Sequence, residues 1–455
     1  MSVRQPAGVP AAGAPAAEVP AAVARRVHWP ELDVVRGVAA VLMVFSHVAA
    51  ALFAGIEYPL SDATGLPTGG LLMQLTWYGG AAPMLFFFVT GLGYGVKGPI
   101  DTARSGSRWR GQGFGDLMIK AAILFAADAL MWMPGGHLVG LDFFGFIAVS
   151  MVVLWVVRAL PGAPLWAAAL AGLVLGLRYA FAPVAGRLLG PEHADTIAML
   201  DRAFGNDEIT AISFPLGPWL VVPLVGFLIG RWMAASRSRL RPALLLLFAG
   251  LLAMTGSYAF AASGGTQFYR WGVLSLPYLV GGLGFNLALL GGLIAWFGQE
   301  RLGGVGRLGW LSLRGIAAFL VVPLHFMIIA LGLGLGLRGE PFPALNTPGP
   351  WLWVLGLPAL MLWLAPLLAR LIRHVCGPDR KRPARRTLAT RPAPLAASWI
   401  GIVAACAALA VLLFMFNAPG WIETVLRSLG QLALCALLVL PLTPVPAAAP
   451  RTSAG

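Results

Sequence analysis

The chain has 455 residues, of which 58% are hydrophobic and 11% are charged, and its mean hydropathy is +0.80. Soluble domains carry about 25% charged residues, so this composition excludes a soluble enzyme and indicates a polytopic membrane protein. The net charge of +14 does not indicate nucleic-acid binding, because the basic residues lie in alternate loops between apolar runs.

The two ends of the chain lack apolar runs. Residues 1–29 are rich in Ala and Pro, with no apolar core ahead of a cleavage site, so they predict a disordered tail rather than a signal peptide. Residues 446–455 predict a second, shorter disordered tail. Arg25 and Arg26 directly precede the first apolar run, which indicates a cytoplasmic N-terminus.

The first apolar run, Glu31 to Ala54, carries ionisable side chains at helical spacing. Arg36 and His47 are separated by about 1,100° of helical rotation, roughly 20° past three full turns, so both lie on one face near Asp33. The histidine lies roughly 16 Å deeper than the arginine, and ionisable groups at bilayer depth are candidates for function. The alternative is a helix-end pair of Asp33 and Arg36 at the headgroups, with a histidine that is merely buried and hydrogen-bonded.

Runs of about 20 apolar residues, the length that crosses a bilayer, recur along the whole chain. They predict an all-α fold, a polytopic transmembrane helix bundle of about 10–12 spans. The predicted limits of the twelve runs are 34–54, 71–96, 116–134, 139–159, 164–186, 213–234, 241–262, 273–297, 309–334, 350–371, 395–416 and 421–443.

Loop charges predict how these spans are oriented. Basic residues follow the second, sixth and tenth spans, whereas the loop at 187–212 carries more acidic than basic residues. The positive-inside rule then makes that loop external and both termini cytoplasmic. The chain accordingly divides into the tail 1–29, a transmembrane core 30–372, a basic cytoplasmic loop 373–394, C-terminal transmembrane helices 395–445 and the tail 446–455.

Three ionisable residues are expected at a similar depth, slightly outward of the bilayer centre. They are His47 in the first span, Asp128 in the third and His325 in the ninth. If they meet in one cavity, a carboxylate that orients a histidine makes it a suitable general base. The alternative is three unrelated side chains, each hydrogen-bonded to a neighbouring helix.

A second group is expected nearer the cytoplasm, at the depth of Arg36. Thr90 and Gly91 close the second span, and Ser312 and Arg314 open the ninth. Guanidinium groups at this level suit an anionic substrate. For Arg314, a snorkelling anchor at the interface is the alternative role.

Common cofactor motifs are absent from the sequence. It contains no Walker loop, dinucleotide fingerprint, zinc motif or serine-nucleophile motif. The three cysteines are scattered over a basic loop and two apolar spans, which suits neither a metal site nor a disulfide framework. We therefore expect no bound cofactor, no metal and no nucleic-acid partner.

Several of these stretches resemble one family. LDVVRG with the following arginine-to-histidine spacing, and FFFVTG at 86–91, resemble the first two spans of the transmembrane acyltransferase superfamily. That superfamily includes acyltransferase family 3 and the heparan-α-glucosaminide N-acetyltransferase-like proteins, and Thr90 stands where its members usually have serine. SFPLGPWLVVPLVGFLIGR and LGWLSLRGIAAFLVVPLHF resemble later elements of the second group. The resemblance covers most of 30–330, and the last spans match nothing in it.

The resemblance implies a membrane acyltransferase in the plasma membrane, here the inner membrane of a bacterium. It would move an acyl group, most simply acetyl, from cytoplasmic acyl-CoA to a sugar or other hydroxyl or amine acceptor, soluble or lipid-linked, at or across the membrane. His47 would act as the base or carry the acyl group, with Asp128 and His325 as further catalytic residues. The expected substrate-binding residues are Asp33, Arg36, Thr90, Gly91, Ser312 and Arg314.

Two other functions remain open from the sequence. Twelve spans with both termini inside also suit a secondary transporter, although no pair of matching halves is visible. A binding or scaffold protein that has lost catalysis is the third alternative, because Thr90 departs from the family pattern. For the acyltransferase, the expected partners are acyl-CoA, a carbohydrate or lipid-linked acceptor and the lipid bilayer, and homo-oligomerisation is possible.

Overall fold

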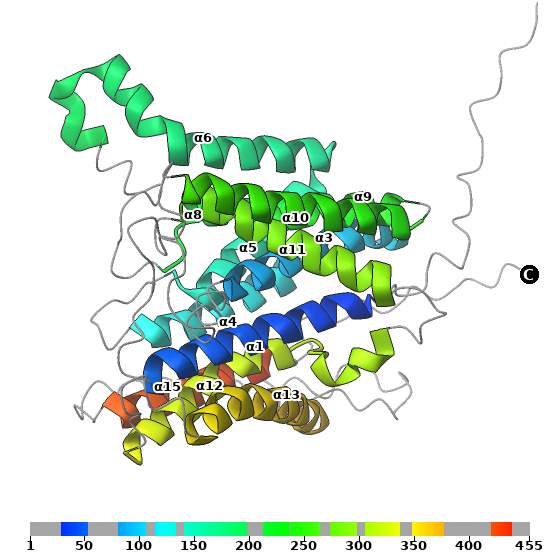
Figure 1. Cartoon of the computed structure of the whole chain (residues 1–455), viewed down its shortest axis with the longest axis vertical. Coiled ribbons are helices and arrows are strands. Elements are labelled where there is room, and N and C mark those ends of the chain that lie inside the picture. Colours follow the sequence, from blue (N-terminus) through cyan, green and yellow to red (C-terminus); the bar gives the residue numbers. More distant parts are fainter. Residues whose placement is uncertain are drawn as a thin grey trace, which may run out of the picture.

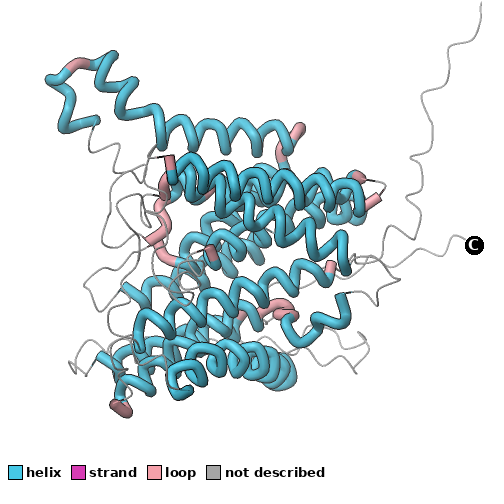
Figure 2. The backbone as a smooth tube through the Cα atoms, in the orientation of Figure 1, coloured by secondary structure: helices cyan, strands magenta, loops and turns pink. Residues whose placement is uncertain are grey.

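The computed structural model describes residues 29–52, 81–105, 114–132, 141–197, 213–236, 238–263, 274–297, 305–336, 348–376 and 420–438. Within these ranges the fold is helical throughout, and no strand longer than a single bridge residue forms (Figure 2). This confirms the all-α prediction. The predicted tails, the span at 395–416 and most of the basic loop lie outside the described residues.

The helices follow one another along the chain as the apolar runs predict (Figure 1). They are α1 (Pro30–Leu52), α3 (Ala82–Ser105), α4 (Phe114–Trp132), α5 (Phe143–Ala159), α6 (Ala163–Leu189), η2 (Pro191–His193), α8 (Leu216–Trp219), α9 (Val221–Ala235), α10 (Leu240–Ala262), α11 (Leu276–Phe297), η4 (Val305–Leu311), α12 (Ala317–Gly334), α13 (Pro348–Cys376) and α15 (Gly420–Leu437).

Six described stretches are long and apolar enough to cross a membrane: Ala163–Ala180, Leu216–Ala235, Leu240–Ala262, Leu276–Phe297, Ala317–Gly334 and Leu352–His374. Ala82–Lys97 and Phe143–Ala159 are shorter apolar helices. These helices show that the chain is a multi-pass integral membrane protein. Which end faces the cytoplasm stays a prediction.

The ninth predicted span begins later than expected. The sequence predicts a helix from residue 309, but α12 starts only at Ala317. The preceding residues form η4 and a short connector, in which Gly315 adopts φ +59°. A left-handed backbone residue interrupts an α-helix, and glycine adopts that conformation without the steric cost other residues pay. The connector therefore carries Ser312 and Arg314 outside the helix.

Glycines bring α3 and α9 into backbone contact. A Cβ at Gly91 would collide with the Pro223 carbonyl group, and one at Gly226 would collide with the Phe88 carbonyl oxygen. Small residues allow this close approach between membrane helices. Gly91, expected at the substrate site, faces α9 instead and is a packing residue.

Six helices form a closed ring in which each contacts the next. Along the ring, α1 packs on α3, α3 on α5, α5 on α4, α4 on α15, α15 on α12, and α12 on α1. On one side α11 packs on α3 and α1 and is itself packed against α10, α6 packs on α9, and on the other side α13 covers α1 and α12 (Figure 1). The ring encloses the buried polar side chains discussed below.

Candidate functional site

Two cavities lie inside the ring, one toward each end of α1. The first, about 510 Å³, contains His47 and is called the His47 cavity. The second, about 760 Å³, contains Arg36 and is called the Arg36 cavity. Each falls in the size range of small-molecule sites.

His47 is held by the other histidine of the predicted group. Its Nδ1 lies 2.8 Å from Nε2 of His325, and the two rings stack with centroids 5.0 Å apart. The Nδ1 of His325 lies 2.8 Å from the backbone oxygen of Val321, one turn earlier on α12. His325 is fully buried, whereas His47 is partly exposed to the cavity.

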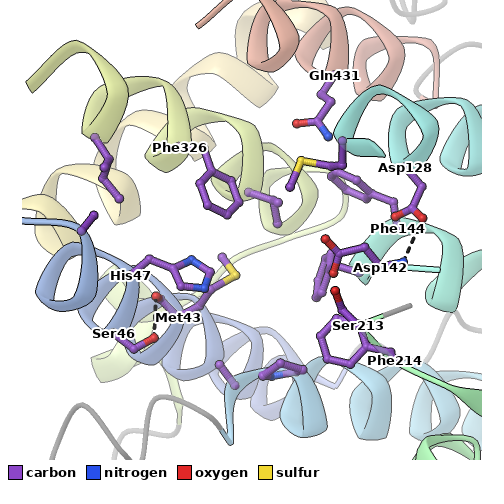
Figure 3. A pocket seen from close by; sticks show the side chains of 17 residues that line it. Met43, Ser46, His47, Asp128, Asp142, Phe144, Ser213, Phe214, Phe326 and Gln431 are labelled. Atoms are coloured by element: carbon purple, nitrogen blue, oxygen red, sulfur yellow. Dashed lines mark hydrogen bonds between the residues drawn. The ribbon is translucent and has the colours of Figure 1, made fainter. Parts of the chain in front are cut away.

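These contacts assign the protons of the neutral pair. A carbonyl oxygen only accepts, so His325 carries its proton on Nδ1 and donates it to Val321. Its Nε2 is then the acceptor, and His47 must donate from Nδ1. This leaves Nε2 of His47 unprotonated on a ring that lines the cavity (Figure 3), as a general base requires.

The wall facing His47 carries two carboxylates, Asp128 from α4 and Asp142 at the start of α5 (Figure 3). Asp128 Oδ2 accepts a hydrogen bond of 2.9 Å from the backbone N–H of Asp142. A Cβ at Gly145 would press on the same carboxylate, so the first turn of α5 sits close over it. Asp128 thus ties α4 to the N-terminus of α5, and His47 is paired with His325 rather than with this carboxylate.

The segment before α8 completes that wall. The backbone N–H groups of Ser213 and Phe214 both donate to the Leu141 carbonyl at 3.1 Å. This places Ser213 beside the Asp142 carboxylate and Phe214 in the cavity lining. Aromatic rings from four positions also face the space: Phe143, Phe144, Phe214 and Phe326.

The Arg36 cavity is strongly basic. Among the residues that the structure describes, six cationic side chains line it against the single carboxylate of Asp33: Arg36, Lys97, Lys120, Arg158, Arg314 and Arg373. They come from the start of α1 and α4, the ends of α5 and α13, α3 and the α12 connector. In the predicted alternation of spans, all these positions fall on the same side of the membrane.

Asp33 organises the two arginines expected at this level. Its carboxylate pairs with Nη1 of Arg36 at 2.5 Å and with Nε of Arg314 at 3.6 Å. Its backbone oxygen accepts a bond of 3.0 Å from the N–H of Leu313, which holds the connector against α1. Gly37 permits this approach, because a Cβ there would collide with the Leu311 carbonyl oxygen.

One residue, Phe143, lines both cavities. Its ring packs edge-on against Phe86 with centroids 5.1 Å apart. The two cavities therefore adjoin at Phe143, whose side chain packs between residues of both linings. A side chain can change rotamer, whereas a helix backbone cannot move aside as cheaply.

The structure brings most of the predicted residues together and leaves two out. His47, His325 and Asp128 lie in or directly behind the His47 cavity, and Asp33, Arg36, Thr90 and Arg314 line the Arg36 cavity. The Thr90 hydroxyl donates to the Phe86 carbonyl at 2.9 Å. Gly91 packs on α9, and Ser312 lines a separate apolar groove between α1, η4 and α13.

Several lining residues escaped the sequence analysis. Asp142 stands directly before an apolar run and reads as an interfacial charge, and Gln431 is a lone polar residue in a span that the resemblance does not cover. Lys120 and Arg158 read as helix-end anchors. Among the described residues, no three His, Cys, Asp or Glu side chains form a group that suits a metal ion.

Comparison with known proteins agrees with the resemblance seen in the sequence. A family model described as heparan-alpha-glucosaminide N-acetyltransferase, catalytic, matches residues 28–261, just over half of the chain. No curated protein and no solved structure matches. The matched range includes the helices that carry His47, Asp128, Asp142, Arg36 and Thr90. The chain therefore belongs to the heparan-alpha-glucosaminide N-acetyltransferase family and is a membrane acyltransferase of that kind.

Proposed function

We propose that the protein transfers an acetyl group from acetyl-CoA in the Arg36 cavity to an amine or hydroxyl acceptor in the His47 cavity. The observation that carries this proposal is the His47–His325 pair, because it leaves one unprotonated ring nitrogen on the wall of a cavity. The family match favours this activity over the secondary transporter.

The charge of the Arg36 cavity supports an anionic donor. Acetyl-CoA carries several phosphate groups, and guanidinium and ammonium groups form strong charge-assisted hydrogen bonds with phosphate. Asp33 holds Arg36 and Arg314 together at the cavity wall, so one carboxylate orients two phosphate-binding side chains. The thioester end would then reach past Phe143 toward His47.

His47 would act as the general base of the transfer. The neutral amine or hydroxyl of the acceptor passes its proton to Nε2 of His47 while its nitrogen or oxygen attacks the thioester carbonyl carbon. The carbon–sulfur bond then breaks, the acetyl group stays on the acceptor, and the departing CoA thiolate takes the proton from His47. His325 stabilises the transient imidazolium by accepting the Nδ1–H bond.

A second route uses the same residue as a nucleophile. Nε2 of His47 would attack the thioester itself and carry the acetyl group before passing it to the acceptor. Direct transfer is the proposal here, because it needs only the proton position that the His325 contact already sets.

The chemistry of the His47 cavity supports an amino sugar as acceptor, in keeping with the glucosaminide in the family's name. Its two carboxylates favour a group that carries hydrogen-bond donors or positive charge. Its four phenylalanines offer flat apolar faces for a ring, and an ammonium group is attracted to such faces.

The test compares His47→Gln with wild type in lipid nanodiscs, using labelled acetyl-CoA and glucosamine. Removing a positioned general base typically costs 10²–10⁴-fold, so transfer should fall by about that factor while donor binding persists. His193→Gln, at an exposed position on η2, is the matched control and should behave as wild type. Transfer by His47→Gln at a near wild-type rate would show that His47 is not the base.

A further inference from the structure

The His47 cavity has a third wall, made by α15. This helix lies outside the range matched by the family model and packs against α4 and α12. It contributes a single residue to the cavity lining, Gln431 (Figure 3).

Two side chains of α15 dock it on α4. The Gln431 amide nitrogen donates to the Ala127 carbonyl at 2.9 Å, and Nη1 of Arg427 donates to the Met131 carbonyl at 3.3 Å. The donor Gln431 follows Arg427 by four residues on α15, whereas its acceptor Ala127 precedes Met131 by four residues on α4. The two helices therefore run antiparallel here. The first of these bonds also fixes how the Gln431 amide is turned, with its nitrogen toward α4.

The other end of that amide has no partner. Gln431 is fully buried, and its Oε1 makes no hydrogen bond within the described part of the chain. The Asp128 carboxylate also keeps one unpaired oxygen: the Asp142 N–H donates to Oδ2 and the Phe144 and Gly145 backbone groups lie close to the carboxylate, while the buried Oδ1 has no hydrogen-bond partner among the described residues. Asp128 follows Ala127, to which Gln431 is bonded, so the two oxygens belong to adjoining parts of one wall.

Buried acceptors of this kind are normally paired, with protein, water or a ligand. Here both belong to residues that line a cavity, across from His47 (Figure 3). Neither Asp128 nor Gln431 is close enough to His47 to be hydrogen-bonded to it in the structure. They are therefore suited to hold a part of the acceptor other than the group that reacts.

We propose that Gln431 and Asp128 form a recognition subsite for a non-reacting hydroxyl or amine of the acceptor, and that Gln431 determines acceptor specificity. The proposal rests on acetyl transfer in the His47 cavity. The two oxygens accept hydrogen bonds, so the subsite would bind a group that donates them. That group would lie on the acetyl-accepting substrate, away from the amine or hydroxyl that reacts. A sugar ring with several hydroxyls satisfies that requirement.

The test measures kcat and the acceptor KM at saturating acetyl-CoA for wild type and Gln431→Met, with glucosamine and its single-deoxy analogues. Methionine keeps the approximate volume and length of the side chain but replaces the amide with a thioether, which is only a weak acceptor and has no donor. Losing one hydrogen bond at a buried polar site should raise the glucosamine KM about tenfold or more, with kcat little changed. Wild type should discriminate against one deoxy analogue, and Gln431→Met should lose that discrimination.

Ser428→Ala is the matched control on the same helix. Ser428 is buried on α15 but does not line the cavity, so this variant should keep the wild-type KM and discrimination. Gln431→Asn is a second variant that retains the amide on a shorter side chain. It should give an intermediate KM, which loss of α15 packing alone would not produce.

Binding of glucosamine to His47→Gln protein separates the two proposals, because it needs no turnover. Weaker binding in the double variant His47→Gln/Gln431→Met than in His47→Gln supports the subsite even if the base assignment fails. The subsite is wrong if Gln431→Met keeps the wild-type KM and analogue discrimination, or if glucosamine does not bind to the wild-type protein.

Discussion

At the scale of single residues, the pairing of two histidines is the feature with most consequence. His325 is buried behind His47, bonds to Val321 on one side and to His47 on the other, and so sets which nitrogen of His47 is free. We propose that His325 positions a base rather than meeting the substrate.

This role predicts a difference between two substitutions of His325. Glutamine has one acceptor and one donor end, so His325→Gln can accept from His47 and donate to Val321. His325→Leu fills the space without either bond. We expect kcat to fall about tenfold or more in His325→Leu and to be largely retained in His325→Gln, measured by acetyl transfer at saturating substrates. If His325→Leu is inactive while His47→Gln remains active, the base lies on α12.

Arg36 is predicted to act on the donor. Arg36→Lys keeps the positive charge but loses the planar fork, which pairs with Asp33 and would at the same time pair with a donor phosphate. The KM for acetyl-CoA should rise about tenfold while kcat and the acceptor KM change little. Arg187→Lys, at an exposed position near the end of α6, is the control and should leave all three constants unchanged. An unaltered donor KM in correctly inserted Arg36→Lys protein would contradict the assignment.

At the scale of elements, helix contacts decide which residues of a motif touch the site. The FFFVTG stretch on α3 turns one side to the Arg36 cavity through Phe86, Val89 and Thr90, and another to α9 through Gly91. In a helix, neighbouring residues in sequence point about 100° apart, so a contiguous motif need not share one function.

The packing role of Gly91 is tested by Gly91→Ala. The added methyl group would meet the Pro223 carbonyl, so α3 and α9 must separate, and overpacking of this kind typically costs 1–3 kcal/mol. We expect a lower thermal midpoint by fluorescence-monitored unfolding, with the donor KM of the folded fraction unchanged. Gly93→Ala on the same helix meets nothing within 4 Å and should be as stable as wild type. An unchanged midpoint in Gly91→Ala together with a raised donor KM would restore Gly91 to the substrate site.

At the scale of the whole molecule, the helix ring separates charge along the membrane normal. Six basic side chains line the Arg36 cavity against the single carboxylate of Asp33, whereas the described lining of the His47 cavity has the carboxylates of Asp128 and Asp142 and no Lys or Arg. The start of α1 is also tied to the start of α10, where Arg239 lies 3.1 Å from the Glu31 carboxylate and over the Trp29 ring. This arrangement suits a donor and an acceptor that approach from opposite faces.

The orientation of that arrangement is tested by labelling single cysteines in a cysteine-free background. An impermeant thiol reagent added outside intact cells should modify Asp195→Cys, which lies in the predicted external loop, and should spare Arg382→Cys, which lies in the predicted basic loop. Both should react after the membrane is permeabilised. The opposite pattern would invert the membrane orientation and place the donor outside.

The sequence predicted the helical fold, and most of the candidate residues it named lie at the two cavities, because both depend on local features. Apolar runs define helices irrespective of their neighbours, and the spacing of Asp33, Arg36 and His47 needs only helical geometry. The start of α12 was placed too early because the left-handed conformation of Gly315 cannot be read from an apolar run.

What only the tertiary structure decided is which side chains meet. Asp128 and His325 were predicted to share a site with His47 because all three lie at a similar depth in the membrane. Depth along the membrane normal does not specify which side of a helix faces which neighbour. In the folded chain His325 became the partner of His47, Asp128 bound the first turn of α5, and Gln431 entered the cavity from a helix about 300 residues further along the chain than Asp128. Rotation and order of helices in the ring arise from packing between distant segments, which no local pattern encodes.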